Sequence, residues 1–280
     1  MKSIRASVFA TFVEFHHLQI WSHQLSSAPF KKYISAIKSY CGDPLSSELL
    51  MERDDAVSVY YSPFEWVNKE ARVVLVGITP GKTQAANALA EAKRSLLSNL
   101  SEEQALQRAK ATGAFSGTMR PNLIAMMDAV GLNTWLGLPS CGSLFDRDAK
   151  LLQTASVLQF PVFLNGENYN GTPDPLKNPL LRNMVLEHFG AQCSQLPGAI
   201  YIPLGPVPTK VLVWLATQGT VSSSRILDGM PHPSGANAER IKYFLVQKKR
   251  GELSKKTDPV KLDEARARLQ HAVRSLPSLK

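Results

Sequence analysis

Three short stretches of the chain combine glycine with side chains that can bind a ligand or move a proton. Residues 77–83 read Gly-Ile-Thr-Pro-Gly-Lys-Thr, residues 165–166 read Asn-Gly, and residues 232–235 read His-Pro-Ser-Gly. Glycine-rich backbone at the start of a helix can hold an anion, and histidine can donate a hydrogen bond or a proton near neutral pH. We therefore take these three stretches as the candidate site.

The first stretch ends in Gly-Lys-Thr, as the phosphate-binding loops of nucleoside triphosphatases do. Such a loop has four residues between its glycines, so that successive N–H groups point at the phosphates. Here only three residues separate Gly77 from Gly81, and one of them, Pro80, has no N–H. Asp228 is the nearest candidate for a magnesium ligand after a strand. A P-loop-like NTPase is kept as an alternative function.

The segments before these stretches are expected to be strands. Apolar, β-rich runs predict strands at 72–78, 156–164, 199–204 and 225–227, and a further strand at 57–61. Each of the three stretches follows one of these runs. A parallel sheet built from them would bring its ligands to the carboxyl ends of the strands, where the three stretches lie.

Helices are expected between the strands. Apolar periodicity and helix-start signals predict them at 83–100, 122–130, 209–217 and 236–246, and a Ser-x-x-Gln capping signal opens another at Ser101. Strands that alternate with helices imply an α/β fold. We predict a three-layer α/β/α sandwich with a central, mainly parallel four-stranded sheet.

The positive charge of the chain is unevenly distributed. Of the net +9, residues 239–280 carry +7, from 12 Lys or Arg against 5 Asp or Glu, while residues 1–238 carry only +2. We divide the chain into an α/β domain at 1–247, in which 1–50 form an N-terminal helical extension, and a basic, helical C-terminal tail at 248–280. Such a charge run is commonly a solvated helical face, and the alternative is a surface that binds phosphates.

Composition excludes several classes of protein. With 44% hydrophobic and 20% charged residues the chain can bury a core, which argues against disorder over most of its length. Its longest apolar runs, such as 73–78, are far shorter than the roughly 20 residues of a membrane span, and we expect no export signal and a cytoplasmic location. Cys41, Cys141 and Cys193 are widely spaced, so we expect neither a metal site nor a disulfide framework.

Two of the stretches together resemble the motifs of the uracil-DNA glycosylase superfamily. The first motif reads Gly-Ile-Asn-Pro-Gly in the mismatch-specific uracil and thymine glycosylases, and residues 77–81 read Gly-Ile-Thr-Pro-Gly. The second motif reads His-Pro-Ser-Pro-Leu or Asn-Pro-Ser-Gly-Leu, and residues 232–236 read His-Pro-Ser-Gly-Ala. The resemblance covers residues 57–246. It leaves the N-terminal helices and the basic tail unexplained.

The resemblance implies a monofunctional DNA N-glycosylase. Such an enzyme flips a uracil-like or 5-modified pyrimidine out of DNA and hydrolyses its N-glycosidic bond, with no metal or other cofactor. The implied partner is double-stranded or single-stranded DNA, with no membrane partner, and we expect a monomer at the nucleoid. Excision would serve either base excision repair or defence against modified phage DNA.

The resemblance also implies catalytic residues. His232 would donate a hydrogen bond to the pyrimidine O2, where the charge of the leaving base gathers. Thr79 stands where the family has the Asp or Asn that positions the attacking water, and a threonine cannot act as a general base at neutral pH. Another carboxylate would then have to activate the water, and the candidates are Glu65, Glu167 and Asp174.

Four residues are implied to bind the base. Asn165 would read the polar edge of the pyrimidine, and Phe115 would stack on its face. Ile78 and Gly81 of the first motif would contact it as well. Strict uracil enzymes have a bulky Tyr at the position of Gly81, so glycine predicts tolerance of a 5-substituted pyrimidine.

The remaining expected contacts are to DNA. Ser234, Gly235 and Lys82 would bind phosphates. Ala236 stands where many members insert a leucine into the gap left by the flipped base, and Arg240 could replace that leucine. Because Thr79 departs from the motif, a DNA-binding or nucleobase-binding homologue without catalysis is the second alternative.

Overall fold

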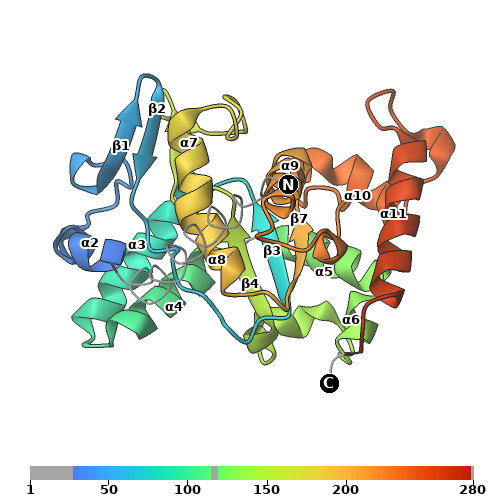
Figure 1. Ribbon diagram of the computed structural model, residues 1–280, viewed down its shortest axis with the longest axis horizontal. Helices are drawn as coiled ribbons and strands as arrows, with labels where there is room; N and C mark the ends of the chain where they lie inside the picture. The colour runs from blue at the N-terminus through green and yellow to red at the C-terminus, as the bar shows by residue number, and fades with distance from the viewer. Residues whose placement is uncertain (1–27, 115–118, 279–280) are drawn as a thin grey trace, which may run out of the picture.

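The computed structural model describes residues 28–114 and 119–278 (Figure 1). The part of the predicted N-terminal extension before residue 28 and the predicted stacking residue Phe115 lie outside this range. The strands are β1 (Leu50–Asp54), β2 (Val57–Tyr60), β3 (Val73–Gly77), β4 (Leu152–Ser156), β5 (Val162–Leu164), β6 (Glu167–Asn168) and β7 (Ile200–Pro203). The helices are α2 (Ala28–Ser39), α3 (Lys82–Leu97), α4 (Glu102–Gly113), α5 (Met119–Ala129), α6 (Leu132–Trp135), α7 (Pro179–Met184), α8 (Ala191–Ser194), α9 (Pro206–Thr217), α10 (Ala238–Phe244) and α11 (Pro259–Arg274).

A parallel sheet lies at the centre of the molecule, in the order β4-β3-β7 (Figure 1). The α/β class is therefore confirmed. The predicted four-stranded sheet is not, because in the described residues the run at 225–227 contributes a single parallel bridge, between Ile226 and Tyr201. The predicted capping box of α4 is confirmed, since the Ser101 hydroxyl accepts the Gln104 N–H at 3.2 Å.

Helices cover both faces of the parallel sheet. Successive residues of a strand point to opposite faces, so each strand contributes to two cores. Val74 and Val76 of β3 belong to a buried core that includes residues of α2, α3, α4, α7 and α9. Val73 and Leu75 belong to a second core with residues of α5, α6, α10 and α11. The sheet thus lies between two helical layers. Within the described residues, no helix is both long and apolar enough to span a membrane.

The strand predicted at 156–164 is wrong, because this run holds only the last residue of β4 and the whole of β5, which lie in different sheets. β4 ends at Ser156, and β5 begins at Val162 in an antiparallel sheet of order β1-β2-β5-β6. Pro161 stands just before β5, and it has no N–H to continue a ladder. The apolar run hides this break, because the connecting residues, such as Val157 and Phe160, are as buried as the strands themselves.

The expected basic tail is part of the folded domain. Its predicted helix is present as α11, whose residues Leu269 and Val273 are buried in the second core. After α11, the Trp135 indole N–H donates to the Pro277 carbonyl at 2.9 Å. The segment therefore packs against α6 and α10 instead of extending from the domain.

Candidate functional site

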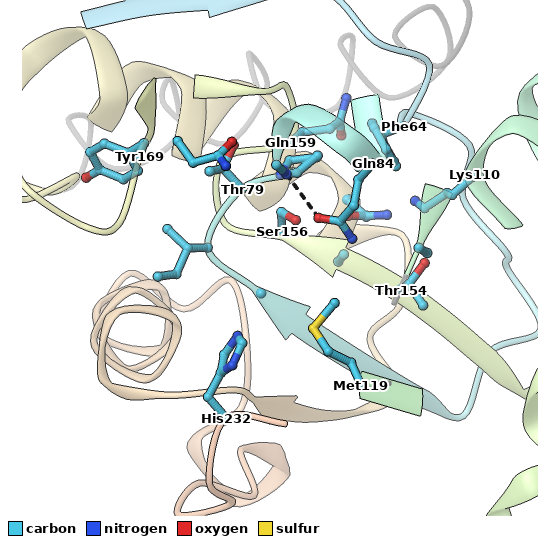
Figure 2. Close-up of a pocket in the computed structure, with 18 residues that line it drawn as sticks. Phe64, Thr79, Gln84, Lys110, Met119, Thr154, Ser156, Gln159, Tyr169 and His232 are labelled. Atoms are coloured by element: carbon cyan, nitrogen blue, oxygen red, sulfur yellow. Dashed lines mark hydrogen bonds between the residues drawn. The ribbon is translucent and has the colours of Figure 1, made fainter. Parts of the chain in front are cut away.

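A cavity of about 260 Å³ lies at the carboxyl ends of β3 and β4 (Figure 2). Its wall is formed by the loop after β3, the end of β4, the connection to β5, and residues of α3, α4, α8 and the His232 loop. Four predicted site residues line it, namely Ile78, Thr79, Gly81 and His232. The structure thus brings the first and third stretches together, as the sequence predicted.

His232 lines this cavity as a neutral hydrogen-bond donor. Its Nδ1 accepts the Ser234 N–H at 3.2 Å, and burial lowers the pKa of the imidazole below its usual value. A neutral ring whose Nδ1 accepts carries its proton on Nε2. The Asn122 side chain fixes the loop that carries His232, because its Nδ2 donates to the Pro233 carbonyl at 2.8 Å.

Thr79 joins two segments of the cavity wall. Its hydroxyl donates to the Phe160 carbonyl at 3.0 Å and accepts the Val162 N–H at 3.1 Å. The donor of the hydroxyl is therefore used within the protein, and only one lone pair is left for a water. The geometry gives Thr79 a positioning role, fixing the loop after β3 against the β4–β5 connection.

Replacing Thr79 with valine is expected to lower the free energy of unfolding by about 1–3 kcal/mol, because it leaves a part-buried carbonyl and a part-buried N–H without partners. Urea unfolding of the two proteins measures this difference. Thr79→Ser keeps the hydroxyl and is the matched control. Full stability of Thr79→Val would contradict the positioning role.

The N-terminus of α3 is occupied by side chains of the protein itself. The Lys82 N–H donates to Asn168 Oδ1 at 2.8 Å, and the Gly81 N–H donates to Gln84 Oε1 at 3.0 Å. The first two N–H groups that a phosphate loop would present are thus engaged. The Lys82 side chain is exposed and does not line the cavity.

Asn168, and not Asn165, is the asparagine at the cavity. Asn165 is exposed in the turn between β5 and β6, with φ of 52°, and lies outside the cavity wall. Asn168 lines the wall, and its Oδ1 accepts the Lys82 N–H. Among the residues that the structure describes its Nδ2 has no acceptor, so it can donate to a ligand. A Cβ added at Gly81 would meet Asn168 Oδ1 at 3.5 Å, an ordinary van der Waals contact, so this amide lies next to the side that is expected to be open.

None of the three candidate carboxylates lines the cavity. Glu65 is buried, accepts the Tyr61 hydroxyl at 2.8 Å, and has its pKa raised to about 7 by burial. Asp174 pairs with Lys210, which lowers the pKa of its carboxyl. Glu167 is exposed on β6. Within the described residues the cavity wall holds no Asp or Glu, and no group of His, Cys, Asp or Glu is placed to hold a metal ion.

The chain is similar over its larger part to a bacterial protein, Uncharacterized protein YoxB of Bacillus subtilis (strain 168). The two sequences are 38% identical over 205 residues, which is 72% of this chain and 80% of that protein. The chain belongs to the YoxB family. No protein-family model and no solved structure matches it.

The cavity of this YoxB family member holds buried polar residues that the sequence analysis missed. They are Lys110 of α4, Gln159 of the β4–β5 connection and Gln192 of α8, each at most 8% exposed. A signal existed for one of them. Lys110 follows Leu106 by four positions, which places the lysine on the apolar face of its helix.

The expected DNA-contacting residues lie beside the cavity of the YoxB family member and not in its wall. Ser234 Oγ accepts the Asn237 side-chain N–H at 3.2 Å, and Arg240 donates to Asn237 Oδ1 at 3.0 Å. Gly235 and Ala236 are exposed at the start of the next helical turn. The polypeptide after His232 thus presents small and cationic residues at the surface.

A cationic hollow lies between α10 and α11. Its lining includes Lys248, Lys249, Arg250 and Arg266, together with two acidic residues. Part of the charge is paired, since Lys248 contacts Glu239 at 2.8 Å. The hollow therefore gathers four of the twelve Lys and Arg residues of 239–280 on a folded surface.

Proposed function

We propose that the protein is a DNA glycosylase that excises a uracil-like or 5-modified pyrimidine from DNA. The observation that carries the proposal is the neutral His232, with Nε2–H as its donor, in a cavity beside the Gly-Ile-Thr-Pro-Gly loop. Its place beyond the carboxyl ends of parallel strands is the usual ligand site of such sheets. DNA is the proposed partner, and the nucleoid the proposed place of action.

The finer fold of the resemblance fits this proposal. Ile226 forms a parallel bridge beside β7, on the side away from β3. A fourth strand at 225–227 would extend the order β4-β3-β7 and lead directly into the His232 loop. The proposed fold is the three-layer sandwich with four parallel strands.

In the proposed reaction the bond between C1′ and the base nitrogen breaks, and its electron pair stays on the base. The Nε2–H of His232 donates to the oxygen on which this charge gathers, and a preorganised donor of this kind stabilises the transition state. Water then forms the new bond to C1′ and loses its proton to solvent. Since no described carboxylate lines the cavity, we place proton loss after cleavage of the glycosidic bond.

One observation favours a second candidate, a nucleobase-binding protein without catalysis. The donor of the Thr79 hydroxyl is used within the protein, and the described cavity wall offers no carboxylate as a general base. The P-loop-like NTPase has less support, because the first N–H groups of α3 bind Gln84 and Asn168.

Incubating the full chain with a panel of duplexes tests the proposal. The duplexes carry uracil, thymine mismatches or 5-modified cytosines, and alkali then cleaves any abasic site. We expect strand cleavage for at least one modified base. Base-dependent binding without cleavage would favour the binding protein, and thermal stabilisation by ATP that is lost in Lys82→Ala would favour the NTPase.

A further inference from the structure

One side of the cavity carries a buried amine. Lys110 is 4% exposed and lines the cavity, and Figure 2 shows it on the side opposite His232. Its Nζ donates to the Trp66 carbonyl at 2.6 Å. A lysine side chain has three N–H donors as an ammonium and two as a neutral amine, so this contact leaves at least one of them for a ligand.

A second buried donor in the same wall has no acceptor. Gln192 of α8 is 3% exposed, and its Nε2 makes no hydrogen bond within the part of the chain that the structure describes. Buried side-chain donors nearly always have a partner. An oxygen atom of a bound molecule would accept a hydrogen bond from Gln192 Nε2.

The charge around Lys110 also favours an acceptor. Burial lowers the pKa of this lysine to about 7, and burial raises that of the neighbouring Glu65 to about 7. Glu65 does not line the cavity, and one of its oxygens, Oε1, is bound by the Tyr61 hydroxyl. The carboxyl beside the amine is therefore Glu65, outside the wall, and the described wall itself offers Lys110 no Asp or Glu as an acceptor.

We propose that Lys110, with Gln192 as a second donor in the same cavity wall, forms a specificity subsite for an oxygen acceptor, a carboxylate or a carbonyl, and that Lys110 meets the edge of the base away from His232. The inference rests on the proposed function and adds the chemistry of the base. A base with a carboxylate at this edge gains charge-assisted hydrogen bonds, whereas a base with a methyl group leaves both donors unsatisfied. Lys110 is then the residue that distinguishes the two.

Binding of free bases to the full chain at pH 7 tests the subsite apart from excision. The probes are uracil-5-carboxylate and thymine, measured by calorimetry. We expect the carboxylate to bind about tenfold to a hundredfold more tightly than thymine, as a charge-assisted hydrogen bond allows. In Lys110→Met this preference should disappear, with thymine binding unchanged. Lys38→Met, at an exposed lysine of α2 outside the wall, is the matched control and should keep the preference.

A second variant guards against misfolding of Lys110→Met. Gln192→Glu places a negative charge in the same wall and should weaken carboxylate binding at least tenfold while thymine still binds. Equal binding of the two bases, with excision intact, would overturn the subsite alone. Equal loss of both in Lys110→Met would assign the lysine a structural role. Failure of both bases to bind, together with no excision, would overturn the proposed function as well.

Discussion

Replacing His232 with alanine is expected to reduce base excision by about a hundredfold to a thousandfold. The imidazole is the donor at the leaving base in the proposed reaction, and removal of one such preorganised donor has an effect of this size. Single-turnover cleavage of the best duplex in the panel measures it. The loss should fall on the rate of the chemical step, with DNA affinity largely kept, because the charge on the base develops only in the transition state.

Two further measurements separate this role from a structural one. His271→Ala removes an exposed histidine of α11 and should leave the rate unchanged. The pH profile gives the protonation state of His232. Because burial lowers its pKa below about 6.5, the neutral ring persists at pH 7, and the rate should fall only in more acidic solution. A rate that rises as the pH falls would indicate an imidazolium and contradict the assignment.

The strands β3 and β7 were predictable because their signals are local, whereas the prediction at 156–164 included only the last residue of β4. The apolar run before Gly77 is a buried parallel strand, and the run at 199–204 contains β7. Chain direction in a parallel sheet then fixes which loops share an edge. This is why Ile78 and Thr79 could be placed beside His232, although His232 is distant from them in the sequence.

The rest of the site depends on contacts between distant segments. The Asn-Gly pair at 165–166 marks a turn, but only the pairing of β5 with β6 shows that Asn168 returns to α3. Likewise, the spacing of Lys110 places it on a buried face, yet nothing in the helix shows that this face meets a cavity. The prediction of Asn165 as the asparagine at the cavity was therefore wrong. The sequence shows an asparagine after a strand, but it does not show the direction in which the chain turns there.

Replacing Leu269 of α11 with alanine is expected to lower the free energy of unfolding by about 2–5 kcal/mol, the usual cost of a cavity in a packed core. Leu269 is 2% exposed and belongs to the core on one face of the parallel sheet. Val260→Ala, at a residue of the same helix that is 47% exposed, is the matched control and should change stability little. Urea unfolding measures both variants. A small effect of Leu269→Ala would mean that residues 248–280 are an independent tail.

The large effect expected here means that deleting residues 248–280 would damage the fold that holds His232. The contribution of the basic surface to DNA binding should therefore be measured by substituting exposed lysines such as Lys249.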